Sequence, residues 1–180
     1  MKVIKENTAA VFIDLQERLF PHMQNRDELK RNMIRLIRGL QALQVPMITT
    51  QQYTKGLGET IPEIREAIGE VAQVEKISFS CCGNGDFMDQ LEWQNKKFVI
   101  IAGIEAHVCV LQTVLDLLSD EYVPVVTADC ISSRKVYDKE VAIERMRDSG
   151  AIISTYESIL FELTGVAGTD VFKSISKIIK

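Results

Sequence analysis

The 180-residue sequence has no apolar run that approaches the roughly 20 residues needed to span a bilayer. It also has no excess of positive charge, because the formal net charge is −4 and the Lys and Arg residues are scattered. Nucleic-acid binders concentrate Lys and Arg on one face, so this composition argues against such a partner. The first seven residues hold two lysines and a glutamate where a signal peptide would place apolar residues. We therefore expect no membrane partner, no nucleic-acid partner and a cytoplasmic location.

The sequence has few residues suited to hold a metal. It contains only two histidines, and no C-x-x-C or H-x-x-x-H spacing occurs. Two of its four cysteines, Cys81 and Cys82, are adjacent, and only a strained ring could join them. A chain of this length with 46% hydrophobic residues can build a core without disulfides. We expect free thiols, no structural zinc and no cofactor.

Short apolar runs bounded by turn residues recur along the chain and indicate strands buried on both faces. Segments with helical spacing separate them, and this alternation predicts a parallel sheet covered by helices. No repeat or linker divides the chain, so we expect a single domain over residues 1–180. The expected strands are 9–13, 46–50, 72–76, 98–102, 124–127 and 151–154. The expected helices are 27–44, 62–68, 85–93, 106–118, 138–149 and 170–179, the last a packing or oligomer helix.

Crossover handedness predicts how these strands are arranged. Right-handed connections favour a three-layer α/β/α, Rossmann-like fold with the six parallel strands in the order 3-2-1-4-5-6. Ligands bind such sheets outside the carboxyl ends of the strands, where the order reverses. Here the reversal lies between the first and fourth strands, which end at Asp14 and at Gly103, Ile104 and Glu105. We therefore expect the functional site at that edge.

Three residues near this edge could carry chemistry, although each also has an ordinary structural role. Asp14 follows a buried strand, but an aspartate there often caps the next turn. Cys109 lies in the first helical turn after the fourth strand, where the helix N-terminus would stabilise a thiolate; a buried cysteine is more often a small hydrophobe. Lys76 ends the third strand, and most lysines are solvated. A lysine beside Asp14 and Cys109 would hold the carboxylate and favour the thiolate.

Four ordered segments, residues 11–16, 52–58, 76–80 and 103–113, resemble those of the isochorismatase-like cysteine hydrolases. This superfamily includes nicotinamidases, N-carbamoylsarcosine amidases and isochorismatase domain-containing proteins. The resemblance implies a catalytic triad of Asp14, Lys76 and Cys109 on the isochorismatase-like hydrolase fold. It also implies a cis peptide between Ile104 and Glu105, and an oxyanion hole formed by the backbone N–H groups of Glu105 and Cys109. Homo-oligomers, dimers or tetramers, are common among such proteins.

The resemblance also implies a reaction class. Members that act on isochorismate often lack the cysteine, so Cys109 favours hydrolysis of an amide, carbamoyl or related C–N bond in a small molecule through a thioester. Nicotinamidases carry an Asp-x-His metal pair after the second strand, and the corresponding residues 51–53 are Gln-Gln-Tyr, so we expect no metal. A binding or scaffold protein with little turnover is the alternative, and a nucleotide-binding Rossmann protein is a third possibility.

Aromatic and polar side chains near the strand ends are candidates for the substrate pocket. We predict that Phe20, Gln52, Tyr53 and Phe79 line it, with Phe20 and Tyr53 on loops over the strand ends. The single tryptophan, Trp93, is expected in the core. His107, two residues before Cys109, is expected to face the pocket or a neighbouring chain rather than to act in catalysis.

Overall fold

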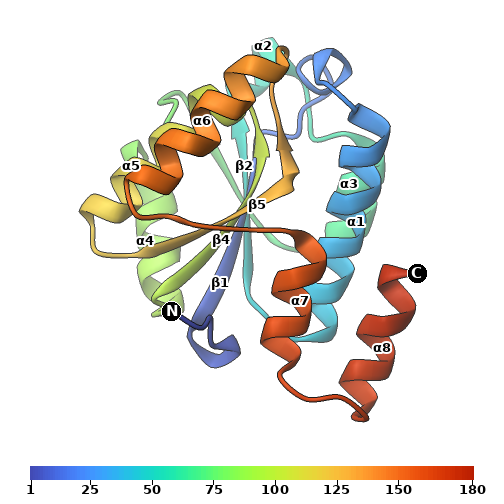
Figure 1. Cartoon of the computed structure of the whole chain (residues 1–180). Helices are drawn as coiled ribbons and strands as arrows, with labels where there is room; N and C mark the ends of the chain where they lie inside the picture. Colours follow the sequence, from blue (N-terminus) through green and yellow to red (C-terminus); the bar gives the residue numbers. More distant parts are fainter.

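In the computed structural model, all 180 residues are described, and six strands form one sheet between two layers of helices (Figure 1). The strand order is β3-β2-β1-β4-β5-β6, and every neighbouring pair is parallel. The predicted α/β class, strand number and strand order are therefore confirmed. The strands are β1 (Thr8–Ile13), β2 (Met47–Gln52), β3 (Ala72–Lys76), β4 (Phe98–Ile104), β5 (Val123–Ser132) and β6 (Ile152–Ser154).

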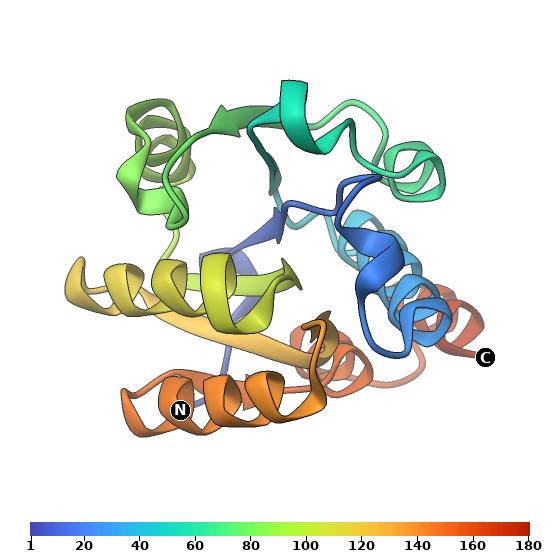
Figure 2. The same cartoon turned by 90° about the horizontal axis from the view of Figure 1, so that it is seen from above.

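Helices cover both faces of the sheet, as the view from above shows (Figure 2). The long helix α1 crosses one face, and the core beneath it is the larger of two apolar clusters. The second cluster fills the other face. The helices on the α1 face are α1 (Arg26–Ala42), α3 (Pro62–Ile68), α7 (Tyr156–Thr164) and α8 (Asp170–Ile179). The opposite face carries α4 (Gly85–Gln94), α5 (Leu111–Ser119) and α6 (Val136–Asp148), and the one-turn helix α2 (Thr54–Leu57) follows β2.

The central strands β1 and β4 lie deepest in the molecule, and every residue of both is buried. Side chains alternate along β1, because successive residues of a strand point to opposite faces. Ala10 and Phe12 belong to the cluster under α1, whereas Val11 and Ile13 belong to the other cluster. A strand buried on both faces needs an unbroken apolar run, which explains why the sequence pattern located it.

Gly103 allows β1 and β4 to approach closely just below the predicted site. Its φ is +137°, a backbone conformation that side-chain-bearing residues rarely adopt. A Cβ atom at this position would lie 2.3 Å from the Ile13 carbonyl oxygen. Gly103 pairs directly with Ile13, the residue before Asp14. Glycine is therefore required here by both conformation and space.

Helix α7 was not among the predicted elements, although the sequence carries a signal for it. The Thr155 side chain caps the helix by accepting the N–H of Ser158, and Gly165 follows its C-terminus. Ile159 and Leu163 are buried against the core at helical spacing. Helix α8 packs against α1 and α7 and buries Ile175 completely, so one face of the C-terminal helix serves intrachain packing.

The prediction that Trp93 lies in the core is wrong, because the residue is 82% exposed. Helix α4 contacts the core through Phe87 and Leu91, which lie four residues apart on one face. Trp93 is two residues beyond Leu91, which turns its side chain away from that face. Side-chain size alone is therefore a poor guide to burial at the end of a helix.

Candidate functional site

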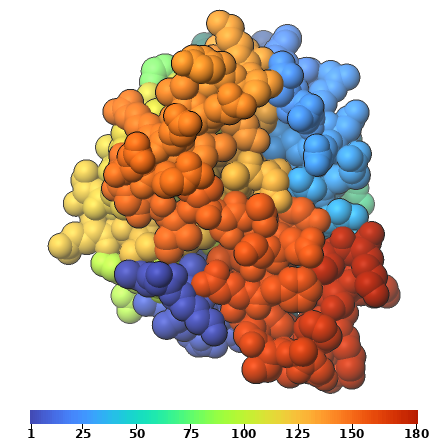
Figure 3. Space-filling view, viewed as in Figure 1, coloured from blue at the N-terminus to red at the C-terminus, as the bar shows by residue number.

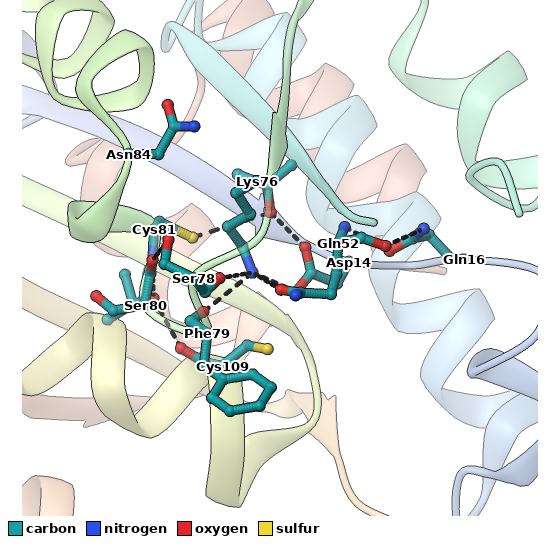
Figure 4. Close-up of polar contacts among 12 residues, drawn as sticks. Asp14, Gln16, Gln52, Lys76, Ser78, Phe79, Ser80, Cys81, Asn84 and Cys109 are labelled. Atoms are coloured by element: carbon teal, nitrogen blue, oxygen red, sulfur yellow. Dashed lines mark hydrogen bonds and ion pairs between the residues drawn. The ribbon is translucent and has the colours of Figure 1, made fainter. Parts of the chain in front are cut away.

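Asp14 lies at the carboxyl end of β1 and is completely buried. It has a positive φ of 52°, which turns the chain sharply out of the strand. Its two carboxylate oxygens have separate partners: Oδ1 accepts a hydrogen bond from Thr50 Oγ1 at 2.7 Å, and Oδ2 accepts one from Lys76 Nζ at 2.7 Å (Figure 4). Because β2 lies between β1 and β3, Thr50 at the end of β2 completes the contact between them.

Lys76 ends β3 and is 1% exposed, so its ammonium group has left bulk water. Nζ donates to Asp14, to Gln52 Oε1 at 2.8 Å, and to the carbonyl oxygens of Phe79 at 3.0 Å and Ser78 at 3.2 Å. Burial, the largest single influence, works against the charged form, but Asp14 together with the neighbouring thiols Cys81 and Cys109 raises the pKa of Lys76 above its ordinary value. The ammonium is thus a fixed positive charge that holds the Asp14 carboxylate in place.

Gln52 holds this ion pair in place. Its side-chain oxygen accepts from Lys76, and its Nε2 donates to the Ile77 carbonyl at 2.7 Å. The buried Gln16 side chain makes two hydrogen bonds to the backbone of Gln52. Gln16 Nε2 donates to the Gln52 carbonyl at 3.0 Å, and the Gln52 N–H donates to Gln16 Oε1 at 2.7 Å. We predicted Gln52 in the substrate pocket, and the structure places it as a support for Lys76.

Cys109 is 6% exposed and lies in a π-helical segment, Ala106–Val110, that precedes α5. This differs from the expected continuous helix over 106–118. The N–H groups of Val108 and Val110 both donate to the Glu105 carbonyl, at 3.1 and 3.2 Å. Single π turns within helices are frequent at functional sites. The peptide bond between Ile104 and Glu105, directly before this segment, is cis.

Burial and the Asp14 carboxylate raise the pKa of the Cys109 thiol well above its ordinary range, which favours the protonated form. Lys76 opposes this shift but does not overcome it. This direction runs against the expectation that the helix N-terminus and Lys76 favour a resting thiolate. The arrangement is a neutral thiol beside a carboxylate that can accept its proton.

A second thiol lies next to the pair, and the sequence analysis assigned it no role. Cys81 is completely buried, with Sγ 3.9 Å from Thr50 Oγ1, and burial raises its pKa to about 11. Its N–H donates to Thr113 Oγ1 at 2.9 Å, and that hydroxyl donates to the Cys109 carbonyl at 2.7 Å. Thr113 therefore connects the two cysteine segments. In the sequence, only the position of Cys81 shortly after Lys76 indicates that this thiol lies near the ion pair.

The predicted pocket residues differ in their exposure. Tyr53 and Phe79 are 49% and 54% exposed. The Tyr53 N–H donates to the Lys76 carbonyl at 2.9 Å, and the Phe79 carbonyl accepts from Lys76 Nζ at 3.0 Å. Phe20 is instead buried in the apolar cluster beneath α1. The exposed Ile77 also lies in the segment that follows Lys76.

Charged residues surround the turn before Cys109. The Glu105 carboxylate accepts from the backbone N–H of Arg134 at 3.2 Å and from its Nε at 3.1 Å. His107 Nδ1 lies 2.9 Å from Ser133 Oγ, and its Nε2 lies 3.8 Å from Asp138 Oδ2. His107 thus contacts both the loop before α6 and the first turn of α6. No group of three or more His, Cys, Asp or Glu side chains is arranged to hold a metal ion.

Comparison with known proteins agrees with this arrangement. Residues 8–158 match the model of the isochorismatase domain. The chain belongs to the isochorismatase domain family. One relative is the isochorismatase family protein 1B of Dictyostelium discoideum, 38% identical over 99% of this chain and 89% of its own length. None of the helices in this family member is long and apolar enough to cross a membrane.

Solved structures show the same fold for this isochorismatase domain. The structure titled MAR1 ribonuclease from Caenorhabditis elegans has a TM-score of 0.94 at 36% identity and covers 99% of this chain and 92% of its own. The Escherichia coli YcaC gene product, titled an octameric hydrolase of unknown specificity, also has a TM-score of 0.94. At 22% identity over 99% of this chain and 89% of its own, that second likeness concerns the fold. The protein is thus a member of a hydrolase family with a buried Asp–Lys pair near a cysteine.

Proposed function

We propose that this protein is a cysteine hydrolase that cleaves an amide, carbamoyl or related C–N bond of a small molecule. Cys109 is the nucleophile, Asp14 the proton acceptor and donor, and Lys76 the group that holds Asp14 in place. One observation carries the proposal: the buried Asp14–Lys76 ion pair, closed at 2.7 Å, adjoins the Cys109 thiol at the edge where β1, β3 and β4 end. Ligands of open parallel sheets bind at this kind of edge.

The first half of the reaction forms a thioester. Asp14 takes the proton of the Cys109 thiol as Sγ attacks the substrate carbonyl carbon, and the carbonyl electron pair moves to oxygen. The backbone N–H groups of Glu105 and Cys109 receive this oxyanion. The tetrahedral intermediate then collapses, the C–N bond breaks, and Asp14 gives the proton to the leaving nitrogen. Because the raised pKa of Cys109 favours the neutral thiol, Asp14 removes the proton as Sγ attacks.

The second half releases the product. Asp14, again a carboxylate, takes a proton from a water molecule whose oxygen attacks the thioester carbon. The C–S bond breaks, the acid product leaves, and the proton returns to Cys109. Lys76 keeps its proton throughout, since its pKa is raised and its ammonium is surrounded by four acceptors. Its role is to keep the carboxylate of Asp14 oriented toward Cys109 in both half-reactions.

The exposed side chains of Tyr53 and Phe79 support a substrate with a small apolar or planar acyl group. Both are half exposed beside Lys76, and flat apolar surfaces at the rim favour such groups over highly charged polymers. An RNA substrate, suggested by the name of the Caenorhabditis elegans structure, fits less well with a net charge of −4.

The proposal is tested by ammonia release from a panel of small primary amides and carbamoyl compounds. Cys109→Ala should abolish turnover, and the matched variant Cys130→Ala, which removes a buried thiol from β5, should retain it. Intact mass spectrometry of the wild type with a slowly hydrolysed substrate should show one acyl group on Cys109. Equal turnover in Cys109→Ala and wild type would exclude this nucleophile. No turnover and no acylation across the panel would favour the binding-protein alternative.

A further inference from the structure

A cavity lies at the same edge of the sheet as the proposed active site but beside β5 and β6. Strand β6 pairs only with Val125–Thr127, whereas β5 continues to Ser132. Past the end of β6, α1 and α6 flank the β5 extension, and they face each other across it in Figure 3. The cavity between them has a volume of about 430 Å³, within the range of small-molecule sites. Neither Asp14, Lys76 nor Cys109 lines it.

Lys139 of α6 contributes an ammonium group to this cavity without a partner. The side chain is partly buried, yet Nζ makes no hydrogen bond and no ion pair within 4.0 Å. Burial lowers its pKa, even though the carboxylates of Asp129 and Glu28 act in the opposite direction. Removing a charged group from water is costly unless a partner compensates it. Lys139 thus has three N–H donors directed at no protein acceptor.

Asp129 contributes a carboxylate to the same cavity. Its Oδ1 accepts the N–H of Tyr156 at 2.9 Å, and its backbone carbonyl accepts from Asn32 Nδ2 at 3.1 Å. These bonds fix the residue between α1 and α7, but no cation lies within 4.0 Å of the carboxylate. Burial raises its pKa. Two opposite charges therefore line one cavity without pairing directly.

The rest of the lining is mostly polar but includes apolar side chains. Leu29 of α1, Ile131 of β5 and Ile143 of α6 all lie on the cavity wall. A ligand that joins Lys139 to Asp129 can contact these apolar side chains as well. A simple anion would meet the carboxylates of Asp129, Glu28 and Glu140, whereas a simple cation would leave Lys139 unpaired.

We propose that this cavity binds a small zwitterion of the amino-acid class, with the ligand carboxylate on Lys139 and its ammonium group on Asp129. The methylene groups between them contact Leu29, Ile131 and Ile143. This site is separate from the proposed hydrolase chemistry and needs none of its residues. A ligand that bridges the two charges supplies each with the counter-charge that the protein does not provide.

The test measures binding by isothermal titration calorimetry at neutral pH with 4-aminobutyrate, butyrate and butylamine as probes. Glycine, β-alanine and 5-aminovalerate extend the series in length. We expect saturable binding of at least one zwitterion, and binding of butyrate and butylamine that is weaker by about tenfold or more, the loss of one charge-assisted contact. Comparable binding of all three probes would overturn the proposal, as would no saturable binding of any zwitterion at tens of millimolar.

Variants assign the binding to the cavity. Lys139→Met should weaken zwitterion binding by about tenfold or more, to the level of butylamine. Lys135→Met is the matched control, because Lys135 is exposed, precedes the same helix and does not line the cavity. Its affinity should equal that of the wild type. Thermal unfolding and amide NMR spectra of both variants establish that they are folded, so unchanged affinity in folded Lys139→Met would overturn the assignment.

Discussion

Two lysine–aspartate arrangements lie at the same edge of the sheet. They differ in whether the two opposite charges pair with each other. At the candidate active site, Lys76 and Asp14 form an ion pair, and the Lys76 ammonium also donates to three further oxygen atoms. In the cavity between α1 and α6, Lys139 and Asp129 line one space without touching. A complete network is preorganised by folding, whereas an incomplete one leaves its charges to solvent or to a ligand.

The difference follows from sheet geometry. Asp14 and Lys76 emerge from strands on either side of β2, and Thr50 and Gln52 of that strand fill the space between them. On the other side, β6 is only three residues long and ends before the β5 extension. On the β6 side, no strand pairs with residues 128–132 to carry comparable side chains, although β4 pairs with Ile131 and Ser132 on the other side. The short β6 thus explains why the cavity beside it stays open, whereas side chains of β2 fill the space between Asp14 and Lys76.

The largest expected effect comes from removing one charge of the complete pair. Asp14→Asn leaves the Lys76 ammonium buried without a counter-charge, so we expect the free energy of unfolding to fall by about 3 to 5 kcal/mol. Urea unfolding followed by circular dichroism measures this. The control is Glu63→Gln, which breaks the exposed ion pair with Lys30 and should cost less than about 1 kcal/mol. Equal losses in the two variants would mean that the buried pair contributes no more than a surface pair.

Gly103→Ala should damage the same site through the backbone. The added Cβ would meet the main chain of Ile13 at 2.3 Å, in a residue whose φ is +137°. We expect a loss of about 3 kcal/mol in the free energy of unfolding, from overpacking and backbone strain together. Gly85→Ala is the matched control, since a Cβ there meets nothing within 4 Å, and its stability should be unchanged or slightly higher. A fully stable Gly103→Ala variant would show that β1 and β4 can separate without cost.

An alkaline loss of stability should come next in size. Burial raises the pKa of Cys81 from an unfolded value of 9.0 to about 11, so the unfolded chain loses this proton first. The contribution is therefore present below pH 9.0 and is lost as the pH rises toward about 11, by about 2 to 3 kcal/mol for this thiol. Urea titrations across this range measure the slope. Cys81→Ala should flatten the dependence of stability on pH, and an unchanged slope would contradict the role of this thiol.

The smallest expected effect concerns the unpaired lysine. Lys139→Met removes a partly buried ammonium that has no partner, so the free energy of unfolding at neutral pH should change by less than about 1 kcal/mol. Because burial lowers the pKa of Lys139, the change should favour the variant if it is measurable. Lys76→Met, by contrast, should be destabilised as strongly as Asp14→Asn. Similar losses in the two lysine variants would remove the distinction between the sites.

The sequence by itself determined the strand order and the edge where the site lies. Buried strands need continuous apolar runs, and right-handed crossovers leave few orders for six of them, so local patterns were sufficient. The positions of Asp14 and Lys76 at strand ends also followed from these runs. Helix α7 could have been predicted in the same way, because Thr155 is a typical N-cap residue and the apolar Ile159 and Leu163 lie four positions apart.

Only the tertiary structure decided how the charges behave. The protonation of Cys109 depends on burial and on its distance from Asp14, which lies 95 positions earlier in the sequence. The support of Lys76 by Gln52 and the unpaired state of Lys139 likewise depend on which strands end where. Apolar periodicity reports which face of an element is buried, whereas electrostatics depends on distances between elements that no local pattern contains.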